Sequence, residues 1–257
     1  MHLEDPDFPP AAGHRFFVHQ DAWKTDTLTL LGGEARHCAE VLRHRAGDRV
    51  TAFDGRGREA ACTITEVSKR SVTLTIVSER RISKPALDLV LIQAIAKSKA
   101  MDWLVQKATE IGVTRICPVT TERTVVKIKS APDATKHREK WERIALETAK
   151  QCTRAWLPEI TDPQPLATIL KQPPASELRI VAALDAETLP LRAAIESHPE
   201  RPHGATVLVG PEGDLSSSEL DEAKAAGFVP VTLGQNILRS ETAALVALSV
   251  LAHELTP

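Results

Sequence analysis

The sequence changes its hydrophobic period once, near residue 85, and this change constrains the fold more than any other feature. Before it, short runs rich in Val, Thr and Phe alternate apolar with polar residues, as half-buried strands do. After it, apolar runs such as residues 87–95 alternate with segments whose apolar residues recur at helical spacing, as in residues 98–111. The sequence therefore predicts a β-rich domain followed by an α/β domain.

The first domain is expected over residues 14–84 and is predicted to be a small β-barrel. One helix, residues 34–44, interrupts its strands, and the charged stretch 78–85, which ends in Pro85, is the best candidate for a linker. Residues 1–13 are acidic and Pro-rich and are expected to be a flexible N-terminal segment. The expected strands are residues 15–19, 27–30, 49–53, 60–65 and 71–77.

The second domain is expected over residues 85–257. Strands at 87–95, 114–119, 179–184, 206–209 and 229–233 alternate with helices that include 98–111, 133–151 and 241–253. Such alternation is typical of a mostly parallel sheet with helices on both faces. Ligands of such sheets bind beyond the carboxyl ends of the strands, so the turns that leave the strands are the first places to search for a site.

The total charge of -2 is near neutral, although the chain contains two basic segments and one acidic segment. Residues 14–84 hold 13 basic and nine acidic side chains, and residues 97–154 hold 13 and seven. Residues 155–257 hold six basic and 14 acidic side chains. The basic segments are compatible with a local footprint for a polyanion, and equally with an ordinary solvated surface.

The four cysteines are far apart and form no CxxC pair, so neither a zinc ribbon nor a redox motif is predicted, and no metal is expected. The chain shows no signal peptide and no apolar stretch of membrane-spanning length, which makes the cytoplasm the default location and excludes a membrane partner. Neither a GxGxxG fingerprint nor a GxxxxGK[ST] loop is present, which argues against NAD or ATP.

Two turns near the C-terminus combine features of a binding site. Residues 210–213, GPEG, follow a buried strand and precede Ser216 and Glu219, which have the spacing of a capping box. Residues 233–243 run from a strand into the last helix and place the apolar Ile237 and Leu238 in a loop. Each turn alone is more simply a structural connection, and Ser240 and Glu241 alone are most simply helix caps. The pairing of the two turns favours a site.

These motifs together resemble the RsmE family, bacterial methyltransferases of the SPOUT class that methylate N3 of a uridine in 16S ribosomal RNA. The resemblance covers nearly the whole chain and includes Gln151 and Cys152. Its motifs are residues 43–48 (RHRAGD), 91–97 (LIQAIAK), 101–112 (MDWLVQKATEIG), 121–127 (TERTVVK), 210–213 (GPEG) and 237–243 (ILRSETA).

The resemblance implies a PUA-like N-terminal barrel that binds RNA, a SPOUT α/β domain with a deep trefoil knot, and a homodimer that acts in rRNA processing and ribosome biogenesis. It implies that S-adenosylmethionine binds in the knot loops. Its contacts would fall on Leu184, Gly210, Glu212, Gly213, Leu233, Gly234, Ile237, Leu238 and Ala243.

Two positions depart from the family pattern. Asp214 stands where a second glycine is usual, and Asn236 stands where a basic residue is usual. Asp and Asn both tolerate left-handed backbone conformations, so the loops are expected to keep their shapes. A cation near the substrate is then missing, which affects substrate binding more than cofactor binding.

For the chemistry, the target uridine is expected to be flipped into the site, where N3 loses its proton and takes the methyl group. Arg239 is the first candidate to stabilise negative charge on the uracil oxygens. Glu212 and Glu241 are the candidate bases, and each has an equally simple structural role.

RNA docking is assigned to the basic segments, with the cluster expected to matter more than any single member. The candidate phosphate contacts are Arg15, Arg36, Arg43, Arg45, Arg49, Lys97, Lys107, Arg123, Lys127 and Arg154.

Two alternative functions remain open. The first is a non-catalytic RNA-binding or ribosome-assembly factor that has lost methyl transfer through the changes at Asp214 and Asn236. The second is a SPOUT enzyme that modifies another RNA nucleotide.

Overall fold

The computed structural model describes residues 13–23, 25–68, 70–185, 187–198 and 200–256, and the chain forms two compact units. The first unit comprises the chain up to Lys84 together with Leu146–Leu157, and the second comprises Pro85–Ala145 and Pro158–Pro257. The expected flexible segment, residues 1–13, lies outside the described residues except for Gly13. Within the described residues, no helix is both long and apolar enough to span a membrane.

The first unit is built on a five-stranded sheet with the order β1-β3-β4-β5-β2. β1 pairs with β3 in parallel, and the other pairs are antiparallel. The strands are β1 (Arg15–Phe17), β2 (Thr27–Leu31), β3 (Arg49–Phe53), β4 (Arg58–Val67) and β5 (Ser71–Arg81). The short helical segments are η1 (Gln20–Ala22), α1 (Gly32–Arg36) and η2 (His37–Val41), the last a π-helical turn.

The expected linker at residues 78–85 is wrong for its first half, because β5 continues to Arg81. Residues 78–81 pair with residues 58–61 of β4. Two ion pairs hold this extension: Arg58 binds Glu79 at 2.7 Å, and Arg80 binds the fully buried Glu59 at 2.9 Å. The charged side chains that suggested a linker are therefore the cross-strand partners of a hairpin.

The segment Leu146–Leu157, which the sequence placed with the second domain, belongs to the first unit. The backbone N–H of Gly57 donates to the carbonyl oxygen of Ala155, and that of Leu157 donates to Gly55. Trp156 donates its indole N–H to the carbonyl oxygen of Ile82 at 2.9 Å. Local periodicity could not place this segment, since its partners lie about a hundred residues earlier in the chain.

The second unit contains an eight-stranded sheet in which every pair is parallel. The strand order is β11-β13-β10-β12-β6-β7-β8, and β9 also pairs with β7. This confirms the predicted α/β domain with a mostly parallel sheet. The strands are β6 (Asp88–Ala94), β7 (Arg115–Thr120), β8 (Glu159–Ile160), β9 (Gln164–Pro165), β10 (Leu178–Ala182), β11 (Leu189–Pro190), β12 (Gly204–Val209) and β13 (Val229–Thr232).

Helices cover both faces of this sheet, because alternate residues of its strands are apolar on opposite sides. On β6, Leu89 and Leu91 belong to one core cluster, and Val90 and Ile92 belong to another. The first cluster also contains side chains of α2, α3, α5 and α7, and the second also contains side chains of α4 and α6. The helices are α2 (Ser98–Ile111), α3 (Ala131–Gln151), α4 (Leu166–Lys171), α5 (Leu191–Glu196), α6 (Ser217–Ala225) and α7 (Ser240–Leu255).

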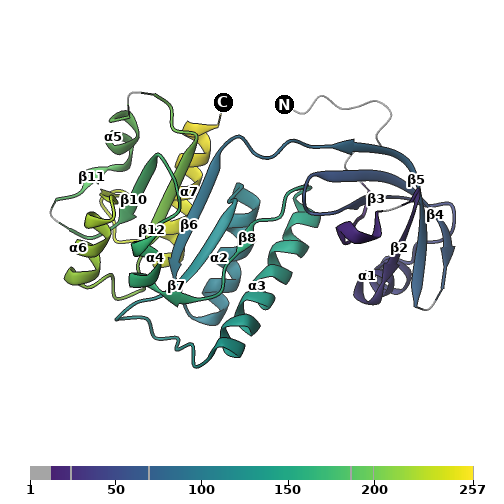
Figure 1. Ribbon diagram of the computed structural model, residues 1–257, viewed down its shortest axis with the longest axis horizontal. Helices are drawn as coiled ribbons and strands as arrows, with labels where there is room; N and C mark the ends of the chain where they lie inside the picture. The colour runs from purple at the N-terminus through teal and green to yellow at the C-terminus, as the bar shows by residue number, and fades with distance from the viewer. Residues whose placement is uncertain (1–12, 24, 69, 186, 199, 257) are drawn as a thin grey trace. The chain divides into compact units, whose positions relative to one another are not determined.

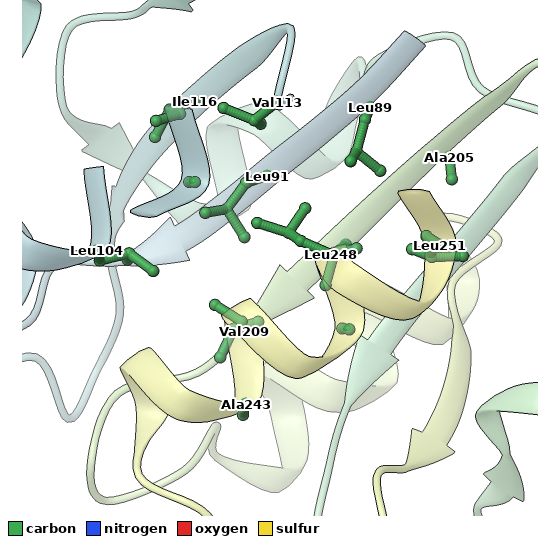
Figure 2. Packing of buried hydrophobic residues seen from close by; sticks show 14 of the residues in the cluster. Leu89, Leu91, Leu104, Val113, Ile116, Ala205, Val209, Ala243, Leu248 and Leu251 are labelled. Atoms are coloured by element: carbon green, nitrogen blue, oxygen red, sulfur yellow. The ribbon is translucent and has the colours of Figure 1, made fainter. Parts of the chain in front are cut away.

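The last helix, α7, runs alongside the two central strands β6 and β12 (Figure 1). Figure 2 shows Leu248 and Leu251 on the side of α7 that faces these strands, and both side chains are fully buried. Burial of one such leucine stabilises a fold by about 1.5–3 kcal/mol. The N-terminus of α7 is therefore fixed at the carboxyl ends of the strands, where the two candidate loops also lie.

Candidate active site

A cavity of about 290 Å³ opens at the carboxyl ends of three neighbouring parallel strands, β10, β12 and β13. The register of the strands brings their ends together, since Ala182 lies opposite both Val209 and Val231. The loops after these strands contribute the remaining walls. The lining residues are Ala182, Ala183, Leu184, Val209, Gly210, Pro211, Glu212, Asp214, Val231, Thr232, Leu233, Gly234, Asn236, Ile237, Leu238, Arg239, Ser240 and Ala243.

The turn after β12 is held rigidly by its own polar groups. Ser216 and Glu219 form the predicted capping box at the start of α6, with Glu219 accepting the backbone N–H of Ser216 at 2.9 Å. A Cβ added at Gly210 would lie 3.1 Å from the nitrogen of Leu215, so the turn has little room for a larger residue there. The turn therefore presents a fixed backbone to the cavity.

Two long-range contacts fix the same turn from outside. Arg123 donates hydrogen bonds from its guanidinium to the carbonyl oxygens of Gly213 at 2.8 Å and Leu215 at 3.3 Å. Glu219 accepts the backbone N–H of Glu122 at 2.8 Å through its second carboxylate oxygen. The segment around Arg123 is thus a brace for the turn.

The loop after β13 ends at a buried polar contact instead of a helix cap. Arg239 is the N-cap residue of α7, and no side chain caps the helix there. The hydroxyl of Ser240 donates to the carbonyl oxygen of Gly210 at 2.6 Å and accepts a hydrogen bond from the Gln93 amide at 2.8 Å. The interpretation of Ser240 as a helix cap is therefore wrong, because its hydroxyl joins the two site loops.

The cavity contains eight of the nine predicted cofactor contacts. The ninth, Gly213, does not line it, and its carbonyl oxygen accepts the hydrogen bond from Arg123. The sequence missed several lining residues, of which Ser240 is the most informative, because a serine before an apolar helix looks like an ordinary cap. Asn236 and Asp214, the two departures from the family pattern, both line the cavity.

The lining suits a small molecule with apolar parts and groups that can hydrogen-bond the backbone. Leu184 and Ile237 are 66% and 79% exposed, so a ligand can cover apolar surface there. Both loops also offer backbone groups close to the cavity, which suits the adenine ring and methionine chain of S-adenosylmethionine. Among the described residues, no group of three or more His, Cys, Asp or Glu side chains is placed to hold a metal ion.

The three candidate catalytic residues separate into two groups. Arg239 and Glu212 line the cavity and are exposed, so both can reach a bound substrate. Glu241 is half-buried in the first turn of α7 and does not line the cavity. The geometry therefore favours Glu212 over Glu241 as a proton acceptor.

The candidate RNA contacts on the first unit differ in availability. Arg15 is buried and its guanidinium binds Glu59, which argues against a phosphate contact. Arg36 is exposed and pairs with Glu40 at 3.0 Å. Arg154 is half-buried, and burial lowers its pKa. The remaining candidates on this unit, Arg43, Arg45 and Arg49, are exposed.

The turn that carries Arg43 and Arg45 is braced by its own polar groups. Asp48 accepts hydrogen bonds from the His44 ring at 2.9 Å and from the backbone N–H of Arg45 at 3.0 Å. These two bonds lower the pKa of Asp48, with the Arg45 backbone contributing most. Arg43 is held at φ 57°. Both arginine side chains are therefore presented from a fixed backbone.

The candidate RNA contacts on the second unit also differ in whether their charged groups already bind another part of the protein. Lys107 pairs with Glu110 at 2.8 Å, and Arg123 braces the turn after β12. Lys97 and Lys127 are exposed, and their assignment as phosphate contacts stays a prediction.

Comparison with known proteins agrees with this geometry. Residues 83–252 match the model of an RNA methyltransferase domain, and residues 30–77 match an RNA methyltransferase PUA domain. A ribosomal RNA small subunit methyltransferase E of Aquifex aeolicus is 31% identical over 88% of this chain and 94% of its own. The chain belongs to the ribosomal RNA small subunit methyltransferase E family. The expected family, the α/β class of the second domain and the PUA-like first domain are thereby confirmed.

Other members of the methyltransferase E family match over similar lengths. The Bacillus subtilis member is 29% identical over 93% of this chain and 96% of its own. The structure of the Neisseria gonorrhoeae methyltransferase E, solved bound to S-adenosyl methionine, has a TM-score of 0.83 and 28% identity. That match covers 94% of this chain and 97% of the Neisseria chain.

Proposed function

We propose that this protein transfers a methyl group from S-adenosylmethionine to N3 of a uridine in 16S ribosomal RNA. The observation that carries the proposal is the cavity at the ends of β10, β12 and β13, which joins an apolar, backbone-rich wall to the exposed cation of Arg239. The Neisseria relative is solved with S-adenosyl methionine, and the curated relatives are small-subunit rRNA methyltransferases, which supports both the donor and the RNA.

The residues that would hold the methyl donor are the eight predicted contacts that line the cavity. The apolar side chains of Leu184, Leu233, Ile237 and Leu238 would cover its adenine ring and hydrocarbon chain, and the backbone around Gly210 would supply polar contacts. When bound, S-adenosylmethionine supplies an electrophilic methyl group on a sulfonium.

Arg239 acts on the uracil. The imide nitrogen is a poor nucleophile while it is protonated, so the site must favour the anion. The Arg239 guanidinium stays charged at neutral pH and would hydrogen-bond the uracil oxygens where the negative charge develops. Glu212, which lines the same cavity, would accept the N3 proton.

The base must leave its stack to reach this cavity, and unstacking costs a few kcal/mol. Arg43, Arg45 and Arg49 of the first unit, and Lys97 and Lys127 of the second, would offset part of this cost by binding phosphates. The trefoil knot, the homodimer and the cytoplasmic location stay predictions from the sequence, and sedimentation velocity would test the homodimer.

The test is methylation of 16S rRNA and of small subunits by the purified protein, followed by mass spectrometry of the nucleosides. Methylation at N3 of one uridine is expected. Modification of a different nucleotide would favour another SPOUT activity, and donor binding without methyl transfer would favour a pure RNA-binding factor.

Arg239→Ala separates catalysis from binding. The rate is expected to fall about 100-fold, as for removal of one donor to a developing anion. Donor affinity measured by calorimetry is expected to change little. Arg201→Ala removes an exposed arginine that does not line the cavity and is the matched control. Near wild-type methyl transfer by Arg239→Ala would refute its role.

A further inference from the structure

Asp214 holds a carboxylate at the wall of the active-site cavity. One of its oxygens accepts the backbone N–H of Leu215 at 2.8 Å, and the other accepts the backbone N–H of Leu184 at 3.3 Å. The residue is half-buried, and its φ of 62° lies in the left-handed region. Two backbone donors therefore fix the position of this negative charge.

The charges that line the cavity are unbalanced. Glu212 and Asp214 are acidic, Arg239 is basic, and the other lining residues carry no formal charge. Glu212 and Arg239 are exposed and can move into solvent, whereas the carboxylate of Asp214 is fixed and half-buried. A fixed, half-buried charge is screened by water and salt less than an exposed one, so the charge of Asp214 acts on a ligand inside the cavity.

The proposed methyl donor and the product that it leaves behind differ in charge. S-adenosylmethionine carries a sulfonium, an ammonium and a carboxylate, for a net charge of +1. When the methyl group leaves, its bonding electron pair stays on sulfur, and the product S-adenosylhomocysteine is a neutral thioether with a net charge of zero. A carboxylate in the wall interacts with the sulfonium and has no such partner in the product.

We propose that Asp214 sets the preference of this cavity for the cationic methyl donor over its neutral product. This inference rests on the proposed function. The charge of Asp214 stabilises the bound donor, and this stabilisation is lost as the methyl group is transferred, which promotes product release. Asp214 is a specificity-determining residue and takes no part in the chemical step.

A purely structural role for Asp214 gives a different outcome. The carboxylate also connects the end of β10 to the turn after β12 through its hydrogen bond to Leu184. If this connection were its whole contribution, its loss would weaken donor and product equally, since both share the same adenosine and amino-acid parts. The ratio of the two affinities therefore distinguishes charge from support.

The experiment measures the dissociation constants of S-adenosylmethionine and S-adenosylhomocysteine by calorimetry for the wild type, Asp214→Asn and Asp214→Gly. Asn keeps the shape and one acceptor oxygen, and Gly adopts a positive φ without strain, so both variants are expected to fold. In both variants, the affinity for S-adenosylmethionine divided by the affinity for S-adenosylhomocysteine is expected to fall by roughly three- to tenfold. This is the size of effect that the loss of one partly screened charge pair implies.

Asp221→Asn is the matched control, because Asp221 is an exposed carboxylate of α6 that does not line the cavity. Its ratio should equal that of the wild type. The wild-type preference should also shrink as salt rises. An unchanged ratio in both Asp214 variants would overturn the inference and leave the proposed function intact. Failure of the wild type to bind either ligand would overturn both.

Discussion

Arg123 donates a hydrogen bond of 2.8 Å to the carbonyl oxygen of Gly213, a residue 90 positions later in the chain. The Cδ of Arg123 would lie 3.4 Å from a Cβ at Gly213, so the side chain also packs across the turn that forms the cavity wall. An arginine predicted to bind RNA is therefore engaged in shaping the wall of the cavity.

Arg123→Ala is expected to weaken donor binding. Loss of the two hydrogen bonds costs about 1 kcal/mol net, which corresponds to a roughly fivefold higher dissociation constant. The guanidinium keeps its charge but is held against the turn by two backbone carbonyl oxygens, so we expect it to contact no phosphate and the salt dependence of RNA binding to change little. Calorimetry with S-adenosylmethionine and a salt titration of RNA affinity measure the two effects.

Arg115→Ala is the control for this change. Arg115 begins β7, at the amino end of the sheet, and pairs with Glu159 at 2.9 Å. Its loss should leave donor affinity unchanged. If Arg123→Ala instead made RNA affinity less dependent on salt and left donor affinity normal, Arg123 would be a phosphate contact, as the sequence predicted.

Ser240→Ala is expected to lower the free energy of unfolding by about 1–3 kcal/mol. The substitution removes the partner of the buried Gly210 carbonyl oxygen and one acceptor of the Gln93 amide, and unpaired buried polar groups carry this cost. Urea denaturation measures the change. Ser249→Ala, on the exposed side of α7, is the control, and equal stability of the two variants would show that the buried contact contributes nothing.

The local features of the site were readable from the sequence because each depends on neighbouring residues. The capping box of Ser216 and Glu219 is a three-residue spacing, and the two loops follow strands that their apolar composition reveals. The parallel sheet then places both loops at one edge. The family resemblance, and not these rules alone, named eight of the cavity's lining residues as cofactor contacts.

The remaining features depend on contacts between distant segments. The bond from Arg123 to Gly213, the buried pair of Arg15 with Glu59 and the bond from Ser240 to Gly210 each join residues at least 30 positions apart. Periodicity and capping rules describe single elements, so they assign such side chains to surface or cap roles. Only the assembled sheet shows that these polar groups are used internally.

Two arginines of the first unit are expected to respond in opposite ways. Arg45→Ala should reduce the slope of log affinity for RNA against log salt by about 1, because its exposed side chain releases one counterion on binding. Arg15→Ala should leave this slope unchanged and lower the unfolding free energy by about 3 kcal/mol, because it removes one partner of the buried Glu59.

Filter binding at several salt concentrations and urea denaturation measure the two responses. Arg45→Lys keeps the charge and should keep the slope. If Arg15→Ala instead reduced the slope of log RNA affinity against log salt and left the free energy of unfolding unchanged, Arg15 would be an RNA contact after all.

The four thiols are expected to differ in reactivity, because alkylation requires the thiolate. Burial raises the pKa of Cys62 to about 12 and the pKa values of Cys38 and Cys117 to about 11 each, so these thiols stay protonated at pH 8. Cys152 is half-buried and is expected to react first. Intact mass after iodoacetamide treatment should show one adduct on the native protein and four after denaturation. Labelling of the buried three should rise only as pH approaches 11. Rapid native labelling of Cys62 at pH 8 would contradict the burial of this side chain.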